Sequence, residues 1–291
     1  MLKKMIALCL VCMLTLAFLG VQAEENKGEW WNILLLGSDD RDMSKHSGRT
    51  DTIIILSVNR ELGSAKMTSI MRDTWVKIPG RKKNKINAAN VFGGPELAME
   101  TVNTSFGTNI QDYILINFRD MVDIVDLFGG VDLELSQSEV KIANDYINSY
   151  KAEAHNQEPY EDYSLIASAG MVHLNGMQAM AHCRDRYTDS DFGRVMRGQD
   201  TLLALAEKAQ NMEVDACLDI AGEIMSFVET NLTDEEVKEL GKAVLTMDVE
   251  NVGQNRLPAD GTYKSGTFDG VWCIRPNLEK NAQILKSYIY G

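Results

Sequence analysis

The chain is poor in positive charge. Its 291 residues include 29 Lys and Arg against 42 Asp and Glu, which gives a formal net charge of −13. Proteins that bind nucleic acid draw most of their affinity from Lys and Arg contacts to phosphates, so this balance argues against a nucleic-acid partner. An anionic ligand must therefore be held by a local cluster of basic residues, with a metal ion as a further source of positive charge.

Cysteine and histidine are also scarce, and neither forms a metal-binding pattern. Cys9 and Cys12 lie in the N-terminal apolar segment, which leaves Cys183, Cys217 and Cys273, an odd number without metal-type spacing. At most one internal disulfide can form, and we interpret the three as small buried residues rather than redox groups. The four histidines show no pair at helical metal-ligand spacing. We expect ordinary surface or core histidines rather than ligands or catalytic bases.

Low-complexity tracts and long linkers are absent, so one large domain is expected. At the N-terminus, two lysines precede an apolar run from Met5 to Gly20, and the small residues of Val21-Gln22-Ala23 follow it. This order is typical of an export signal over residues 1–23. An uncleaved anchor is the alternative, although the run is short for a bilayer that needs about 20 apolar residues. We expect residues 24–291 to form an extracytoplasmic domain, secreted or held at the outer face of the cytoplasmic membrane.

Short runs rich in β-branched residues alternate with stretches of helical periodicity. Strands are expected at residues 33–36, 52–58, 66–71, 113–116 and 131–135, and helices at 95–106, 118–128, 175–186 and 194–210, with two more between 214 and 247. Thr233, with Glu236 three positions later, predicts a capping box at the start of the last helix. The tail from Asn251 is expected to pack back on the domain. This alternation predicts an α/β fold, a single layered domain with a central mixed β-sheet flanked by helices.

Acidic side chains follow the first strand and lead into the second. Gly37-Ser38-Asp39-Asp40-Arg41 comes directly after the first apolar run, and Gly48-Arg49-Thr50-Asp51-Thr52 enters the next. Adjacent strand ends would bring Asp39 and Asp51 side by side at the sheet edge. Paired carboxylates suit a hard divalent cation such as Mg²⁺, with Mn²⁺ as an alternative ion, because these cations prefer oxygen ligands. The other interpretation is that both are ordinary loop aspartates.

Two further segments supply basic residues. Met71-Arg72-Asp73-Thr74 ends the third strand, and Lys85 follows it. The segment from Arg184 to Arg197 contains four arginines and three aspartates in fourteen residues. A solvated charged loop is the alternative, but it explains the clustering of arginine in an acidic chain less well. Guanidinium groups offer paired donors that match phosphate oxygens. Several arginines and one Mg²⁺ would neutralise a pyrophosphate and stabilise the charge on its leaving half.

Six motifs together resemble the LytR-CpsA-Psr family of bacterial cell-envelope proteins, strongly over residues 31–210 and weakly elsewhere. In order, they are N-I-L-L-L-G-S-D-D-R, S-G-R-T-D-T, S-I-M-R-D-T, K-I-N-A-A-N, L-N-G-M-Q-A-M and R-D-R-Y-T-D-S-D-F-G-R-V-M-R. The resemblance implies one α/β domain with an apolar tunnel for a polyprenyl chain. It also implies a Mg²⁺-dependent phosphotransferase that moves a glycopolymer from an undecaprenyl-pyrophosphate carrier at the membrane surface to a muramic acid hydroxyl of peptidoglycan.

The resemblance further implies roles for individual residues. Asp39 and Asp51 match the family's metal-associated aspartates, and Arg72 matches the arginine most important for turnover. Asp191 matches an acid that activates the acceptor or orients an arginine. The expected pyrophosphate-binding residues are Arg49, Arg72, Lys85, Arg184, Arg186, Arg194 and Arg197. Stretches such as 121–128 and 202–205 are candidates for the tunnel lining, with ordinary core packing as the alternative.

Two positions depart from the family pattern. Where R-x-x-R-Q-Q is usual, the chain reads Arg194-Val195-Met196-Arg197-Gly198-Gln199. Gln199 keeps the second glutamine, but Gly198 has no side chain to replace the first. Asn90 stands where an aromatic residue is common, at the expected edge of the pocket.

The sequence leaves a second class of function open. A non-catalytic envelope module that binds polyprenyl phosphates or wall glycans is the alternative to an enzyme, and the missing glutamine at Gly198 leaves this alternative open. The intact set of arginines and aspartates favours the enzyme. A transcriptional regulator fits poorly, since nothing resembles a DNA-reading helix and an exported acidic protein cannot readily reach the chromosome.

Overall fold

The computed structural model describes residues 30–40, 46–153, 162–185, 191–268 and 270–291. Three residues of one helix, Asp191, Phe192 and Arg194, are described by their backbone alone. The predicted export signal at residues 1–23 lies outside these ranges. Among the described residues, no helix combines the length and apolarity needed to cross a bilayer. No disulfide joins the three cysteines of this part of the chain.

The centre of the domain is a six-stranded β-sheet with the strand order β10-β3-β2-β1-β6-β9. Neighbours β1, β2 and β3 are antiparallel, β6 runs parallel to β1, β10 runs parallel to β3, and β9 is antiparallel to β6. The predicted α/β fold with a central mixed sheet is confirmed. The strands are β1 (Trp30–Ser38), β2 (Thr50–Asn59), β3 (Ser64–Ile70), β6 (Asp112–Ile116), β9 (Glu229–Thr230) and β10 (Gly253–Leu257).

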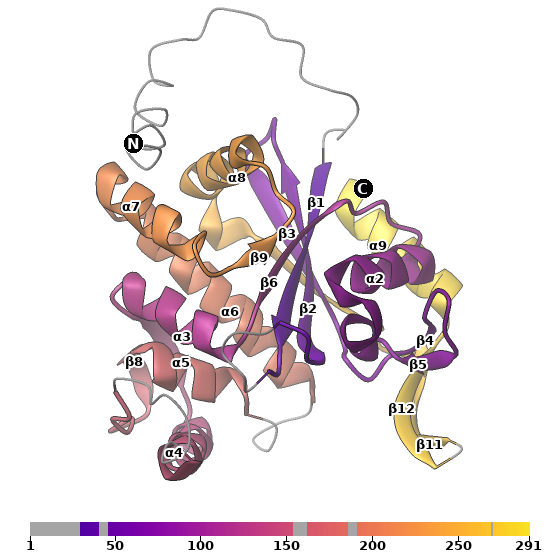
Figure 1. Cartoon of the computed structure of the whole chain (residues 1–291), viewed down its shortest axis with the longest axis horizontal. Helices are drawn as coiled ribbons and strands as arrows, with labels where there is room; N and C mark the ends of the chain where they lie inside the picture. The colour runs from indigo at the N-terminus through magenta and orange to yellow at the C-terminus, as the bar shows by residue number, and fades with distance from the viewer. Residues whose placement is uncertain (1–29, 41–45, 154–161, 186–190, 269) are drawn as a thin grey trace, which may run out of the picture.

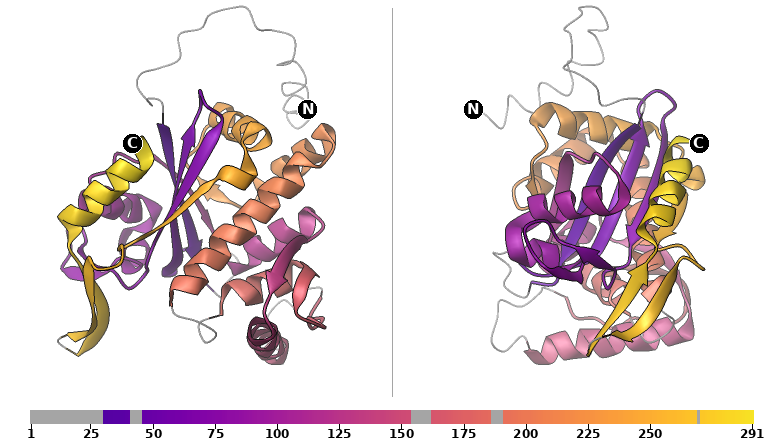
Figure 2. Two further views of the ribbon diagram at one scale, coloured as in Figure 1. Left: turned by 180° about the vertical axis from the view of Figure 1, so that it is seen from behind. Right: turned by 90° about the vertical axis from the view of Figure 1, so that its right-hand side faces the viewer.

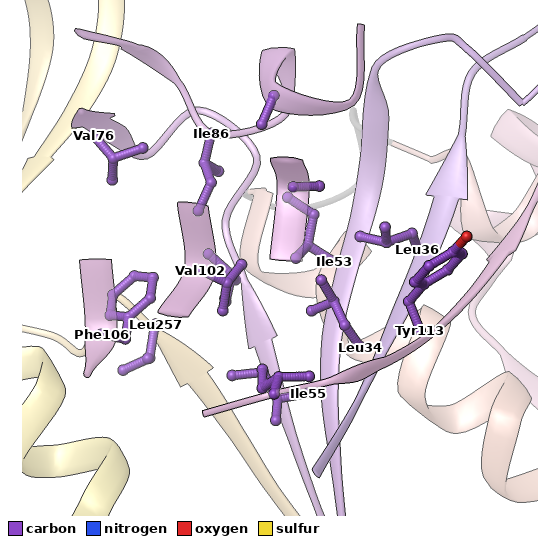
Figure 3. Close-up of a cluster of buried hydrophobic side chains, with 14 of the residues drawn as sticks. Leu34, Leu36, Ile53, Ile55, Val76, Ile86, Val102, Phe106, Tyr113 and Leu257 are labelled. Atoms are coloured by element: carbon purple, nitrogen blue, oxygen red, sulfur yellow. The ribbon is translucent and has the colours of Figure 1, made fainter. Parts of the chain in front are cut away.

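Helices α2 (Ala88–Phe106) and α9 (Leu278–Tyr290) cover one face of this sheet, on the right in Figure 1. Alternate strand residues point to this face, because side chains along a strand alternate between the two sides of a sheet. Figure 3 shows Leu34 of β1 and Ile55 of β2 in the same apolar cluster as Phe106 of α2. Leu34 and Ile55 are both 0% exposed and Phe106 is 2% exposed, so this face is a closed core.

The opposite face carries three helices and adjoins a second apolar core. α6 crosses the sheet, α8 lies beside α6, and α7 lies on the same side of the sheet (Figure 1). The second core lies between α3, α4, α5 and a separate two-stranded sheet of β7 and β8. The bounds are α3 (Phe118–Leu127), β7 (Val131–Leu135), α4 (Gln137–Glu153), β8 (Gly170–Leu174), α5 (Gly176–Cys183), α6 (Asp191–Gln210), α7 (Val214–Ile224) and α8 (Asp234–Thr246). Because α6 contacts both β3 and β7, it links the central sheet to the second core.

The C-terminal tail packs back on the domain, as predicted. After a 3₁₀ turn, β10 adds to the edge of the sheet beside β3, and α9 packs against α2. Between them, β11 (Tyr263–Phe268) and β12 (Val271–Pro276) form a hairpin that projects past the lower end of the sheet in Figure 1, and the two views of Figure 2 show the same arm. The base of the hairpin contacts β4 (Trp75–Lys77), which pairs with β5 (Lys83–Lys85).

Most of the predicted helices and strands are present, but a strand pairs differently from the prediction and a helix begins earlier. The strand at 131–135 pairs with β8 instead of joining the central sheet. The helix predicted from residue 95 begins earlier, at Ala88, and bends at Gly93 and Gly94, whose dihedral angles are not helical. Pro95 then opens the straight part of the helix, where its missing N–H does no harm.

Helix ends were predicted less accurately than helix existence. The helix expected over 175–186 ends at Cys183, and the one expected from 194 begins at Asp191. The predicted capping box at the start of α8 is confirmed, with the Thr233 hydroxyl accepting from the Glu236 N–H at 3.3 Å.

Candidate functional site

The carboxyl end of β1 and the start of β2 form an acidic edge. Ser38 pairs with Thr50 across the two strands. Beyond this pair, the Asp39 N–H donates to the Arg49 carbonyl at 2.9 Å, and the Asp39 carboxylate accepts from the Arg49 N–H at 2.8 Å. These bonds hold Asp39 beside β2, close enough for the charge of Asp51 to act on it. The structure thus brings the two predicted aspartates together.

The Asp39 carboxyl is electrostatically strained. Burial raises its pKa above the ordinary value, and the negative charge of Asp51 raises it further. Asp40 also raises the pKa, and the Arg49 N–H and guanidinium, which lower it, do not offset these three effects. A cation placed beside the two aspartates would relieve this repulsion.

A glycine and a buried asparagine shape the loop that leads into β2. The Gly48 N–H donates to Asp40 Oδ2 at 2.5 Å, and a Cβ at Gly48 would lie 2.8 Å from Asp39 Oδ1. Asn90 of α2 donates to the carbonyls of His46 and Gly48 at 2.7 and 2.8 Å. Asn90, which departs from the family pattern, therefore holds this loop against α2 through two donated hydrogen bonds, which a phenyl ring could not form.

Acidic and basic side chains alternate from β2 to β5. Arg72 forms an ion pair with Asp51, and its Nε lies 3.6 Å from Asp73 Oδ2. Asp73 Oδ1 lies 2.5 Å from Lys85 Nζ. Asn87 adds a hydrogen bond of 3.1 Å to Asp51 Oδ1. Sequence reasoning identified Arg72, Asp51 and Lys85 but gave no role to Asp73, although its place directly after Arg72 was a usable signal.

Arg184 lies in an aromatic cage on the other side of the edge. Its Cζ is 4.5 Å from the ring centre of Phe118 and 5.2 Å from those of Tyr146 and Tyr150. Phe118 follows β6 directly, and β6 is parallel to β1, so Phe118 and Asp39 emerge at the same end of the sheet. The cage therefore places a positive charge at this end, held by cation–π contacts. Sequence reasoning did not find these three aromatic residues.

Arg197 is buried in contacts between helices. It is 4% exposed, and its guanidinium donates to the Asp185 carbonyl at 2.7 Å and lies 3.4 Å from Glu139. Burial acts to raise the pKa of Glu139, but hydrogen bonds from Ser136 and the nearby charges bring it below the ordinary value. Arg197 thus joins α6 to α4, and its pyrophosphate-binding role stays a prediction.

Of the remaining predicted residues, the structure describes the side chain of Arg49 alone. Arg49 has an exposed side chain next to Asp39. Arg186 and the side chains of Asp191 and Arg194 lie outside the described residues. Their predicted roles stay predictions.

The neighbouring residues Gly198 and Gln199 of α6 face in different directions, Gly198 outward and Gln199 toward the sheet. A Cβ at Gly198 would meet no atom within 4 Å, so the first atom of a side chain at this position would lie in open space. Gln199 is 0% exposed and donates to Ser69 Oγ at 2.9 Å and to the Asn255 carbonyl at 3.2 Å. Gln199 therefore ties α6 to β3 and β10.

The aspartate pair has features that fit a hard cation. Within the described part of the chain, the buried atoms Thr50 Oγ1 and Asn87 Oδ1 have no hydrogen-bond partner, and both residues adjoin Asp51. No three His, Cys, Asp or Glu side chains of the described residues form a metal-binding group by themselves. Mg²⁺ commonly uses one or two carboxylates and completes its shell with phosphate oxygens and water. The residues present fit such a shared site better than a cage made by protein alone.

Comparison with known proteins agrees with this architecture. A polyisoprenyl-teichoic acid–peptidoglycan teichoic acid transferase, TagU, from Bacillus mycoides is 34% identical over 254 residues, which cover 86% of this chain and 75% of that protein. The fold is similar to that of Bacillus subtilis TagV, with a TM-score of 0.70, 26% identity and coverage of 91% and 98% of the two chains. It is also similar to TagT (YwtF) with bound octaprenyl pyrophosphate lipid, with a TM-score of 0.67, 21% identity and coverage of 93% and 92%.

The family itself is matched over almost the whole chain. The model of the LytR_cpsA_psr family matches residues 18–287. With the identity to TagU over most of both proteins, this match shows that the chain belongs to the LytR-CpsA-Psr family.

Proposed function

We propose that this protein is a Mg²⁺-dependent phosphotransferase that moves a glycopolymer from an undecaprenyl-pyrophosphate carrier to peptidoglycan during cell-wall assembly. The observation that carries the proposal is the run of alternating charges from Asp51 through Arg72 and Asp73 to Lys85, beside the strained Asp39. The name of the TagU relative and the lipid in the TagT structure support this substrate class. Teichoic acid is therefore the first polymer to test.

The proposed reaction is a displacement at the phosphorus nearer the glycan. A sugar hydroxyl of the acceptor forms a new P–O bond, the bond from this phosphorus to the bridging oxygen breaks, and polyprenyl phosphate leaves with that oxygen. The hydroxyl proton passes to a carboxylate, the role proposed for Asp191 at the start of α6. The product is a phosphodiester between glycopolymer and acceptor, and water in place of the acceptor would give hydrolysis.

We propose that Arg72 acts closest to this chemistry. Asp51 and Asp73 orient its guanidinium before any ligand binds, and preoriented donors stabilise the charge that develops on the leaving phosphate. Lys85, held by Asp73, adds a second positive charge. When bound at Asp39 and Asp51, Mg²⁺ would neutralise phosphate oxygens. The other predicted arginines would bind the pyrophosphate, with Arg184 supplied from its aromatic cage.

The α6 face of the sheet has apolar side chains that fit a polyprenyl chain. Leu35 and Leu56 lie in the middle of the sheet but are only partly buried, and Leu202 and Leu203 of α6 are partly buried beside them. None of the residues of α7 or α8 is buried, although both helices carry apolar residues at helical spacing. Partly accessible apolar groups between two layers support a lipid site here, with the pyrophosphate at the nearby Asp/Arg edge.

The location follows from the substrates. A polyprenyl carrier lies at a membrane and peptidoglycan lies outside the cytoplasm, so we propose an extracytoplasmic protein at the outer surface of the membrane. The role of the relatives in cell-wall assembly supports this location. The export signal at residues 1–23 fits it and stays a prediction.

The proposal is tested by release of polyprenyl phosphate from a lipid-linked glycan donor, with and without Mg²⁺, in the presence of peptidoglycan strands. Arg72→Ala should reduce the rate by about 100-fold or more, as expected for loss of a preoriented donor to the transition state. Asp51→Ala should also abolish transfer, because it removes a metal ligand and frees Arg72.

Arg60→Ala is the matched control. Arg60 is also ion-paired, with its Nε 2.9 Å from Glu239 Oε1, but it follows the far end of β2. Full activity in both the Arg72 and Asp51 variants would contradict the site. Donor binding without any release by the wild type would instead favour the non-catalytic binding module.

A further inference from the structure

The projecting hairpin exposes a tryptophan next to the candidate site. Trp272 of β12 is 43% exposed, although tryptophan is one of the most buried residue types on average. Its ring centre lies 5.9 Å from Lys85 Nζ, the ammonium group that is held by Asp73. The exposed ring therefore continues the surface formed by the alternating charges.

The hairpin is joined to the turn between β3 and β4 that carries Arg72 and Asp73. The Ile274 N–H donates to the Asp73 carbonyl at 3.0 Å, and Ile274 forms a bridge with Thr74. Cys273 and Ile274 are each 1% exposed, so the base of the arm is anchored while Trp272, one residue farther out, reaches solvent. Any ligand on this ring lies at a fixed position relative to Asp73.

Contacts on the other face stiffen the arm. Arg275 Cζ lies 4.0 Å from the ring centre of Phe268, and the position between them on β11 is Gly266. With no side chain at Gly266, the Phe268 ring can lie across the strand, 3.9 Å from where a Cβ would be. Side chains alternate along a strand, so Trp272 lies on the opposite face from Val271 and Arg275.

The direction of the reaction separates the donor from the acceptor. In a phosphoryl displacement, the attacking and leaving oxygens are roughly in line. The leaving polyprenyl phosphate belongs with the α6 face, where Leu35 and Leu56 are partly accessible. The acceptor hydroxyl must then approach from the other side of the edge, where β4, β5 and the hairpin lie with α2 (Figure 1).

We propose that Trp272 is the platform on which a sugar ring of the acceptor peptidoglycan strand stacks. The inference rests on the proposed function, which supplies the acceptor. The apolar face of a pyranose ring fits a flat indole, while the hydroxyls at its rim stay in water. A sugar stacked on Trp272 would place a neighbouring hydroxyl toward Asp73, Lys85 and Arg72. Trp272 is thus a positioning residue for the acceptor and takes no part in binding the lipid.

The test measures acceptor and donor steps separately, with the full chain in detergent and soluble peptidoglycan strands as acceptor. Trp272→Ala should raise the KM for the acceptor by about tenfold or more, as expected for loss of one stacking contact. Hydrolysis of the lipid-linked donor without acceptor should stay within about twofold of the wild type. Trp272→Phe, which keeps a ring, should restore most of the acceptor affinity.

Val271→Ala is the matched control, because Val271 is 40% exposed on the same strand but faces the other way. It should leave the acceptor KM unchanged. An unchanged acceptor KM in Trp272→Ala would overturn the proposal, and so would an equal loss of donor hydrolysis, since the ring would then act through Lys85 on the donor.

Failure of the proposed function gives a different result. If the wild type shows no transfer at all, equilibrium binding of the same peptidoglycan strands to wild type and Trp272→Ala decides the matter. Binding that depends on Trp272 would support the sugar platform even though the transferase proposal had failed. Equal binding by both proteins, or none, would overturn it.

Discussion

The two faces of the central sheet are packed to different degrees. On the α2 and α9 face, Leu34 and Ile55 are 0% exposed and lie in one closed cluster. On the α6 face, Ile54 and Met67 are 1% and 2% exposed, but the neighbouring Leu35 and Leu56 stay partly accessible, and α7 and α8 bury none of their residues. Adjacent residues of one strand therefore face two different environments. We infer that the closed face supplies most of the stability and that the other face is shaped for a ligand.

The largest expected effect comes from the closed face. Leu34→Ala should destabilise the domain by about 2–5 kcal/mol, because it leaves a cavity among residues that cannot relax fully. Leu35→Ala, the next residue on the same strand, should cost less than about 2 kcal/mol, since part of its side chain already contacts solvent. Denaturant unfolding of the two variants measures the difference directly. Equal losses would mean that the faces are packed alike.

On the α6 face, hydrogen bonds from one buried side chain join the helix to the sheet, whereas apolar packing does so on the α2 and α9 face. Gln199 donates to Ser69 Oγ and to the Asn255 carbonyl, and so joins α6 to two strands. Gln199→Ala should destabilise the domain by about 1–3 kcal/mol, because it removes the buried hydrogen bond to Ser69 and the partly buried one to Asn255. Unfolding curves provide the measurement, and hydrogen exchange should show faster opening of α6 than of α2. Unchanged protection of α6 would argue against this role.

A smaller effect is expected at the edge where both faces meet. The raised native pKa of Asp39 means that its ionised form is less favourable in the folded chain than in the unfolded chain. Asp39 therefore lowers stability above its native pKa, and this penalty vanishes as the pH falls below the unfolded value of 3.8. Without divalent cations, Asp39→Asn should be more stable than the wild type at neutral pH, and the gap should close at acid pH.

Chemical unfolding across this pH range measures the difference in stability between the wild type and Asp39→Asn. Added Mg²⁺ provides a second test. Added Mg²⁺ should stabilise the wild type and have little effect on Asp39→Asn, because the ion relieves the repulsion that the substitution has already removed. A less stable Asp39→Asn variant at neutral pH would contradict the assignment of strain to this carboxyl.

The smallest effect is expected at Gly198, a half-buried position of α6. Gly198→Gln restores the side chain that the family usually has, and it should stabilise the helix by about 0.5 kcal/mol because glycine is a poor helix former. A Cβ added at Gly198 meets nothing within 4 Å, so no clash at this atom opposes the gain. Thermal unfolding measures the shift. A loss of stability would show that α6 packs more closely there than the structure indicates.

Local patterns predicted much of the fold. The strands at residues 52–58 and 66–71 and the capping box at Thr233 depend on neighbours in sequence, and all three are confirmed. The strand at 131–135 was predicted but its partner was not, because pairing with β8 joins residues about forty positions apart. The hairpin of β11 and β12 was missed, since a Gly-rich segment with aromatic residues gives no clear alternation.

In the candidate site too, some features could be predicted from the sequence and others could not. Asp39 and Arg72 follow the ends of strands and Asp51 lies at the start of one, so sequence reasoning could bring them to one edge. The partners of Arg184 and Arg197 could not be predicted. Glu139 lies 58 positions from Arg197, and the cage of Arg184 draws on two other helices. These contacts depend on how α3, α4 and α6 pack, which no local pattern of charge determines.

The central claim is that the α6 face holds the lipid and the Asp/Arg edge holds its pyrophosphate. The most direct test is a crystal structure of the protein with a bound polyprenyl pyrophosphate and Mg²⁺. We expect the chain between the sheet and α6, in contact with Leu35 and Leu56, and the pyrophosphate within hydrogen-bond distance of Arg72. A lipid bound on the α2 face or on the outer surface, with its pyrophosphate away from Arg72, would contradict the account.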